Sequence, residues 1–158
     1  SMEFTDFCLE AECLWLIDPS ELDEMDRKAF FINVYNALII HAVIVFGKPE
    51  NSTERMHFYS RASYAIGGRI YSLNDIEHGI LRANRMSWQP IPVRPFSEYD
   101  ARLACATSFD PRIHFVLNCG AKGCPMLRFY DAQTLDESLD VATRIFLSDV
   151  IVDEHSNT

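Results

Sequence analysis

The sequence lacks both clustered basic residues and glycine-rich loops. Lysine and arginine total 14 against 23 aspartates and glutamates, a formal net charge of −9 at pH 7. The basic residues are scattered singly or in pairs, whereas a nucleic-acid surface needs grouped Lys and Arg to meet successive phosphates. Glycine is scarce, six in 158 residues, and no glycine-rich phosphate loop is present. The sequence therefore predicts no nucleic-acid partner and no binding to an anionic membrane surface.

A disulfide framework is also missing. The chain has five cysteines, an odd number, and its first residues "SMEFTDF" contain no basic region followed by a long apolar stretch, as a secretory signal would. A chain of 158 residues is long enough to bury a core without disulfides. We therefore expect reduced thiols, a cytoplasmic location and a single domain over residues 1–158.

The segment "MDRKAFFINVYNALIIHAVIVFGKP" is the most apolar of the chain, and from residue 30 to 46 its strongly polar residues are Asn33, Asn36 and His41. A membrane span takes about 20 apolar residues and tolerates such groups poorly, so a central core helix is predicted instead. On a helix these three residues fall within about 140° of one another. Two interpretations of this polar stripe remain. Its side chains bind loops to the helix, or Asn36 or His41 lines a site.

The pattern changes at "SYAIGGRIYSLNDIEHGILR". The adjacent glycines between two short apolar runs predict a β-hairpin. Ser72, with Asp75 three residues later, is typical of the start of a helix. In that helix an apolar stripe faces inward, Glu77 lies at its edge and His78 is expected to be exposed.

These elements predict an α+β fold. A long buried helix around residues 26–46 packs with a small sheet that includes residues 113–119. Helices at the N-terminus and around residues 134–147 are expected to flank it. Residues 83–98 contain three prolines and little periodicity, so they are predicted to form a long loop.

The stretch "HFVLNCGAKGCP" holds a histidine and two cysteines within twelve residues. If it begins as a strand, His114 and Cys119 point to opposite faces and cannot pair directly. Cys124 follows "GAKG" and precedes Pro125, a residue that favours the first turn of a helix. At such an N-terminus backbone N–H groups, together with the nearby Lys122, would stabilise a thiolate. If one cysteine is reactive, the prediction is Cys124.

Metal binding and redox pairing are weaker interpretations of the cysteines. Cys119 and Cys124 have four intervening residues, as do Cys8 and Cys13, a spacing that structural zinc sites allow. Cys8 and Cys13, however, lie on an expected helix, where five residues turn them about 140° apart. A thioredoxin-type pair needs two intervening residues. No metal and no cofactor are therefore expected.

Three separated motifs make the chain recognisable: "AFFINVYNALIIHAV", "IYSLNDIEHGILR" and "DPRIHFVLNCGAKGCPMLRFYDAQTLDESLDVATRIFLSD". In this order they resemble domain-of-unknown-function family 547, from about Arg27 to Asp149. Its members include plant proteins with leucine-zipper regions and multidomain proteins with glutaredoxin or DEP modules. Typical members have Ser where this chain has Gly123 and Pro where it has Met126. They usually continue with another strand and helix, so the C-terminal edge of the domain is expected beyond residue 158.

The resemblance implies two classes of function. The favoured class is a protein-interaction or regulatory module of a larger intracellular protein, because family members combine this domain with zipper, DEP and glutaredoxin modules. The alternative is a thiol-dependent hydrolase or transferase. In it Cys124 would be the nucleophile, His114 or His78 the base, and Asn36 or Glu77 the orienting group. A protein partner is expected.

Overall fold

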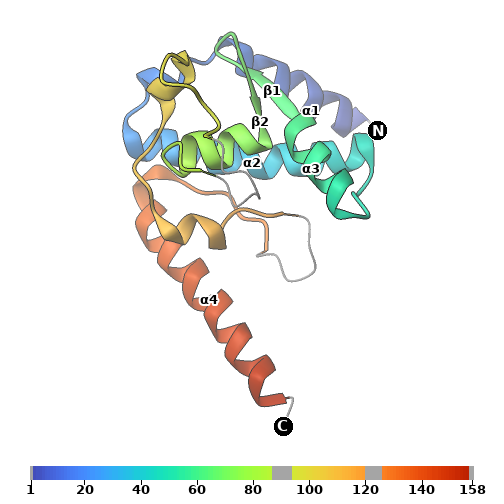
Figure 1. The fold of residues 1–158 in the computed structure, drawn as a ribbon, viewed down its shortest axis with the longest axis vertical. Helices are drawn as coiled ribbons and strands as arrows, with labels where there is room; N and C mark the ends of the chain where they lie inside the picture. The colour runs from blue at the N-terminus through green and yellow to red at the C-terminus, as the bar shows by residue number, and fades with distance from the viewer. Residues whose placement is uncertain (1, 87–93, 120–125, 157–158) are drawn as a thin grey trace.

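The computed structural model describes residues 2–86, 94–119 and 126–156, and it confirms the α+β class (Figure 1). The α-helices and strands are, in chain order, α1 (Met2–Glu12), α2 (Glu24–Phe46), α3 (Ser52–Arg61), β1 (Ser63–Ile66), β2 (Arg69–Ser72) and α4 (Leu135–Ser156). A π-helical segment, η3 (Asp75–Leu81), follows the strands. Short 3-10 helices complete the list: η1 (Cys13–Leu16), η2 (Pro19–Glu21), η4 (Ala101–Cys105), η5 (Pro111–Phe115) and η6 (Ala132–Thr134).

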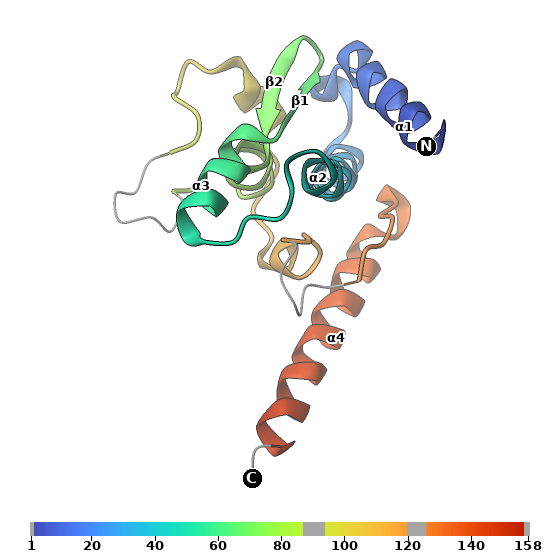
Figure 2. The same cartoon turned by 90° about the vertical axis from the view of Figure 1, so that its right-hand side faces the viewer.

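Helix α2 is the central element, as predicted. The carboxylate of Asp23 caps its start by accepting hydrogen bonds from the backbone N–H groups of Met25 and Asp26, each at 3.0 Å. It ends at Gly47, whose φ of +80° favours glycine. Figure 2 looks along α2 and shows α1, the hairpin, α3 and the start of α4 arranged around it.

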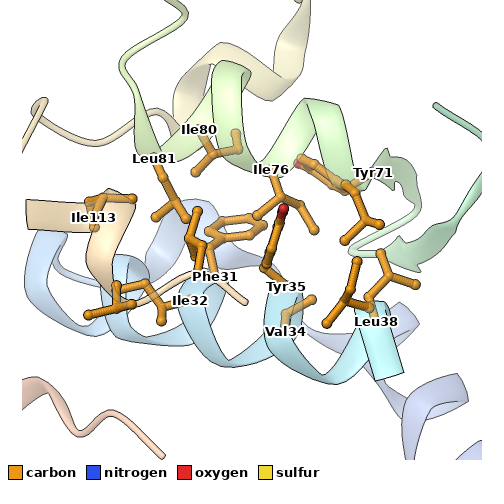
Figure 3. Close-up of a cluster of buried hydrophobic side chains, with 14 of the residues drawn as sticks. Phe31, Ile32, Val34, Tyr35, Leu38, Tyr71, Ile76, Ile80, Leu81 and Ile113 are labelled. Carbon is orange, nitrogen blue, oxygen red and sulfur yellow. The ribbon is translucent and has the colours of Figure 1, made fainter. Parts of the chain in front are cut away.

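The core lies between α2 and η3. Figure 3 shows the α2 side chains Phe31 and Tyr35 pointing toward Ile76 and Ile80 of η3. Fully buried core side chains come from α2, η3 and η5, among them Phe31, Ile32, Ile76, Ile80, Leu81 and Ile113. Segments about 45 to 80 residues apart in the chain therefore meet on one face of α2.

The hairpin prediction is confirmed. β1 and β2 pair antiparallel, and Ile66 opposite Arg69 closes the turn. Gly67 and Gly68 have φ of +54° and +75°, as a two-residue hairpin turn requires. A Cβ at Gly67 would also lie 2.6 Å from the carbonyl oxygen of Ile17, so η1 packs closely against this turn.

The strand prediction for residues 113–119 is wrong, because this segment begins with the 3-10 helix η5 (Pro111–Phe115). Asp110 caps η5 by accepting a hydrogen bond from the backbone N–H of Arg112 at 2.9 Å. The buried residues are Ile113, Val116 and Leu117, which have helical i, i+3, i+4 spacing. A short apolar run fits both the two-residue period of a strand and the period of a helical turn. Asp110, which caps the segment, and Pro111, at its first helical position, favour the helical turn.

Helix α4 starts where predicted and is longer than expected. Leu135, Leu139 and Ala142 are buried, whereas Ile145 is 45% exposed. The C-terminal half of α4 extends away from the other elements in both views (Figures 1 and 2). The next residue, Phe146, still packs against Phe115 of η5, with ring centroids 5.0 Å apart. This turn of α4 therefore contacts η5 through Phe146.

Helix α2 has the length and composition of a membrane span. Half of its most apolar window is buried against the rest of the protein, as in the core helix of many soluble proteins. Length and composition do not separate these cases. That α2 does not cross a membrane therefore stays a prediction.

Candidate functional site

The amides of the polar stripe on α2 bind loops to the helix. Asn36 donates to the carbonyl of Val116 at 3.0 Å and accepts from the N–H of Asn118 at 2.9 Å. Asn33 makes the same pair of bonds to the N–H and carbonyl of Tyr130, at 2.9 and 2.7 Å. Each amide thus supplies one donor and one acceptor to a loop backbone. The candidate residue Asn36 therefore has a structural role.

The motif "SLNDIEH" positions Glu77 and His78. Ser72 and Asp75 cap each other, with the Ser72 N–H donating to the Asp75 carboxylate at 2.9 Å and the Asp75 N–H donating to Ser72 Oγ at 3.1 Å. The segment then winds as a π-helix, in which the Arg82 N–H donates to the Glu77 carbonyl at 2.9 Å. Such wide turns are rare and often occur at functional sites.

Glu77 faces α2. Its carboxylate accepts a hydrogen bond from the hydroxyl of Tyr35 at 3.3 Å. Burial, and secondly the negative charge of Glu77, raise the pKa of Tyr35 well above its usual value, so Tyr35 is a permanent donor. The side chain of Glu77 is 20% exposed. Glu77 is therefore the acidic group beside Tyr35.

His78 is half-buried, and the expectation that it is exposed is wrong. Its Nδ1 lies 2.7 Å from Nη1 of Arg82 and 3.9 Å from the Glu77 carboxylate. Arginine can only donate, so Nδ1 accepts and the ring proton of neutral His78 is on Nε2. Burial lowers the pKa of His78, the charges of Arg82 and His114 lower it further, and Glu77 opposes them. His78 therefore presents a donor, not a general base.

Arg82 adds a buried cation that the sequence interpretation missed. Arg82 is 8% exposed, and its Nε has no hydrogen-bond partner among the residues that the structure describes. A buried guanidinium group with an unsatisfied N–H is costly. Its position four residues after His78 on a helical segment was the signal available in the sequence. Together Arg82 and the Nε2–H of His78 form a region of hydrogen-bond donors.

His114 lies on η5, and this short helix is held by a charge network. Arg112 bonds the carboxylate of Asp110 and also reaches Asp136 and Asp140 of α4, at 2.7 and 2.6 Å. These hydrogen bonds lower the pKa of Asp110 and raise that of Arg112. His114 itself is exposed, and its charge is felt by His78. His114 and His78, two of the candidate residues, therefore interact through their charges.

Cys124, the predicted nucleophile, lies outside the described residues. Cys119 is described and exposed, and its carbonyl accepts a hydrogen bond from the hydroxyl of Tyr59 at 2.8 Å. Within the described parts of the chain, no group of three or more His, Cys, Asp or Glu side chains has the geometry of a metal site. Of the five candidate residues, Glu77 and His78 lie side by side, and Asn36 binds the loop after η5.

A second feature is a groove along the C-terminal half of α2, lined by residues of α1, α2, α3 and β1. Three hollows of about 360, 310 and 280 Å³ follow one another along it. The first two share His41 and Tyr64, and the last two share Phe46 and Arg61. We call this set of connected hollows the α2 groove.

The α2 groove is apolar with a basic end. Val45 and Phe46 line it and are 54% and 48% exposed. The guanidinium of Arg61 lies 4.8 Å from the centre of the Phe46 ring, and Lys48 lines the same end. Neither cation has an ion pair with a residue that the structure describes. Sequence reasoning missed this groove, because it took the apolar helix to be buried nearly all round.

Comparison with known proteins agrees with the motifs on α2, η3 and η5. The family model described as "Protein of unknown function, DUF547" matches residues 19–147, which include the first two motifs and the third as far as Leu147. No curated protein and no solved structure matches the chain. Because the match covers most of the sequence, the chain belongs to the DUF547 family.

Proposed function

We propose that this domain is a protein-interaction module whose docking surface is the α2 groove. The observation that carries the proposal is the exposure of Val45 and Phe46 next to Arg61 and Lys48. Large apolar side chains lining a connected groove are a common feature of sites that bind a peptide or helix.

The proposed occupant is an amphipathic segment of a partner protein, apolar on one side and carrying a carboxylate. Apolar side chains would fill the hollow between α2 and β1, and burying one contributes about 1.5–3 kcal/mol. A carboxylate would pair with Arg61, whose planar guanidinium suits two parallel hydrogen bonds. Glu54 lines the same end, but its carboxylate is held at the start of α3 by bonds from the Glu50 N–H and the Asn51 amide. Among the described residues it forms no ion pair with Arg61 or Lys48, so this end has two cations and one carboxylate.

The polar motif residues support an interaction role over catalysis. The Asn36 amide is bonded to loop backbone, and Nδ1 of His78 is engaged by Arg82. Two of the candidate groups for a thiol-dependent mechanism are thereby committed to other contacts. The catalytic role of Cys124 with His114 remains a separate prediction, tested in the Discussion.

The test uses two synthetic amphipathic peptides with the same leucine stripe, one with glutamates and one with lysines at its polar positions. Binding is followed by ¹H–¹⁵N NMR titration of the whole chain. We expect the glutamate peptide to shift the amide resonances of residues 41–48 and 57–64 in a saturable manner. The lysine peptide should bind at least about tenfold more weakly, because it places like charges beside Arg61.

Two matched pairs of variants locate the binding. Arg61→Glu should abolish the preference for the glutamate peptide, whereas Arg55→Glu, the same charge change on an exposed residue of α3 outside the groove, should leave it unchanged. Val45→Asp should abolish binding. Ile70→Asp, at a residue of similar exposure on β2, should not.

Equal binding of the two peptides, or equal behaviour of the Arg61 and Arg55 variants, would contradict the proposal. Sedimentation of the unliganded chain and flotation with anionic vesicles test the other occupants. Self-association that Arg61→Glu abolishes would assign the groove to a second copy of the chain. Vesicle binding that Val45→Asp abolishes would assign it to a membrane.

A further inference from the structure

A thiol, an imidazole and a phenol lie in line at the α1 end of the groove. Sγ of Cys8 lies 3.8 Å from Nε2 of His41, and Nδ1 of His41 lies 2.9 Å from the hydroxyl of Tyr64. Phe4 and Phe7 of α1 hold the imidazole edge to face, with ring centroids 5.5 and 5.4 Å away. When the Cys8 thiol donates to Nε2, the ring proton is on Nδ1 and points to Tyr64. This is the order of nucleophile, base and orienting group.

The array opens into a hollow of about 360 Å³ between α1 and β1. Cys8 and His41 line it, opposite Trp15, which is 53% exposed. Burial, and secondly the neighbouring Cys8, raise the pKa of Tyr64, so its hydroxyl stays protonated. A small molecule in this hollow would therefore be in contact with both the sulfur and its base.

We propose that Cys8 is a reactive thiol that undergoes thiol–disulfide exchange with small amine-bearing disulfides, with His41 as its general base. The proton of Sγ passes to Nε2 of His41, and Sγ bonds to one sulfur of the bound disulfide. The original S–S bond breaks, and the leaving thiolate takes the proton from His41. Cys8 ends as a mixed disulfide. This proposal does not rest on the docking role of the groove.

The charge of α1 selects the class of disulfide. Glu12 lines the hollow, and α1 carries further carboxylates at Glu3, Asp6 and Glu10 without any basic residue. A cationic disulfide is attracted to such a surface, and an anionic one is repelled. Cystamine should therefore react faster than dithiodipropionate, a diacid of similar size.

The test compares Cys8 with Cys13 in the same molecule. Cys13 is exposed and donates to the carbonyl of Leu9, whereas Cys8 is only half-buried but contacts His41. The chain is treated with each disulfide near neutral pH, then cleaved after glutamate, which places the two cysteines on separate peptides for mass spectrometry. Exposure alone predicts faster reaction at Cys13. General-base assistance predicts faster reaction at Cys8.

The expected result is that cystamine modifies Cys8 before Cys13 and that His41→Phe reverses this order, slowing Cys8 at least about tenfold. Phenylalanine retains the aromatic packing with Phe4 and Phe7. Glu12→Gln should reduce the preference for cystamine. Faster reaction at Cys13 in the unmodified chain, or an unchanged order in His41→Phe, would overturn the proposal. If His41→Phe does not fold, Tyr64→Phe replaces it and should slow Cys8 relative to Cys13.

Discussion

The contact between Asn36 and the loop after η5 gives a sharp stability prediction. Asn36→Ala removes the partner of the Val116 carbonyl, which is buried, and of the Asn118 N–H, which is half-buried. A buried polar group left unpaired costs about 1–3 kcal/mol, and the half-buried N–H falls at the low end because water reaches it. The expected loss is therefore about 2–4 kcal/mol, a large part of the roughly 5–15 kcal/mol that stabilises a typical domain.

Urea unfolding followed by circular dichroism measures this loss. The midpoint should fall while the m-value stays the same, and the melting temperature should fall by roughly 5–15 °C. Asn36→Asp should cost at least as much, because it keeps the acceptor for Asn118 but sets a carboxylate against the Val116 carbonyl.

Two control variants bracket the result for Asn36. Asn51→Ala removes the N-cap of α3, in which the Asn51 side chain accepts from the Glu54 N–H at 2.9 Å, and should cost about 1 kcal/mol. Gln133→Ala changes an exposed side chain and should cost less than about 0.5 kcal/mol. If the midpoint of Asn36→Ala equalled that of Gln133→Ala, the loop would not depend on this amide and the reasoning would be refuted.

Three further predictions concern η3 and Cys124. Gly79→Ala should destabilise the chain by about 1–3 kcal/mol in thermal unfolding, because its Cβ would lie 2.3 Å from the buried ring of Phe96; an unchanged melting temperature would contradict this packing. Since burial lowers the pKa of His78 below 6.5, the unfolded chain binds the proton more readily, and stability should fall as pH drops through that value. His78→Asn keeps an acceptor for Arg82 but does not titrate, so its urea midpoint should change less between about pH 7.5 and 5.5; an equal change would exclude His78 as the cause. Iodoacetamide at about pH 6.5 should label Cys124 faster than a model thiol, as peptide mass mapping would show, and an equal rate would remove the nucleophile hypothesis.

The helix and hairpin predictions succeeded where the signal is local. Ser72 and Asp75 cap each other as their spacing predicts, and two adjacent glycines form the hairpin turn. The prediction for residues 113–119 failed because a short apolar run fits a strand and a helical turn equally well. Asp110 precedes Pro111 and Arg112 in the sequence, an arrangement typical of the cap that the structure shows. The apparent alternation of apolar and polar residues favoured a strand instead.

The catalytic roles of the candidate residues stay a prediction. Glu77, His78 and His114 were identified from motifs; Glu77 and His78 lie 3.9 Å apart, and the charge of His114 lowers the pKa of His78. The protonation of His78 could not be predicted, because it depends on a contact with Arg82 across a π-helical turn. The prediction was made for an ordinary α-helix, in which these side chains point in other relative directions than in a π-helix.

The sequence alone determined the family and the long central helix, predicted around residues 26–46 and found at Glu24–Phe46, because caps and apolar periods act between residues close in the chain. Tertiary structure decided the partners of the polar side chains. Asn36 meets a backbone 80 residues away, and Cys8 meets an imidazole 33 residues away. A hydrogen bond depends on distance and direction in space, and these are set only when the core between α2 and η3 has packed. Tertiary structure also decided which side of α2 is exposed. The apolar residues of a helix that stay uncovered depend on where the neighbouring elements end.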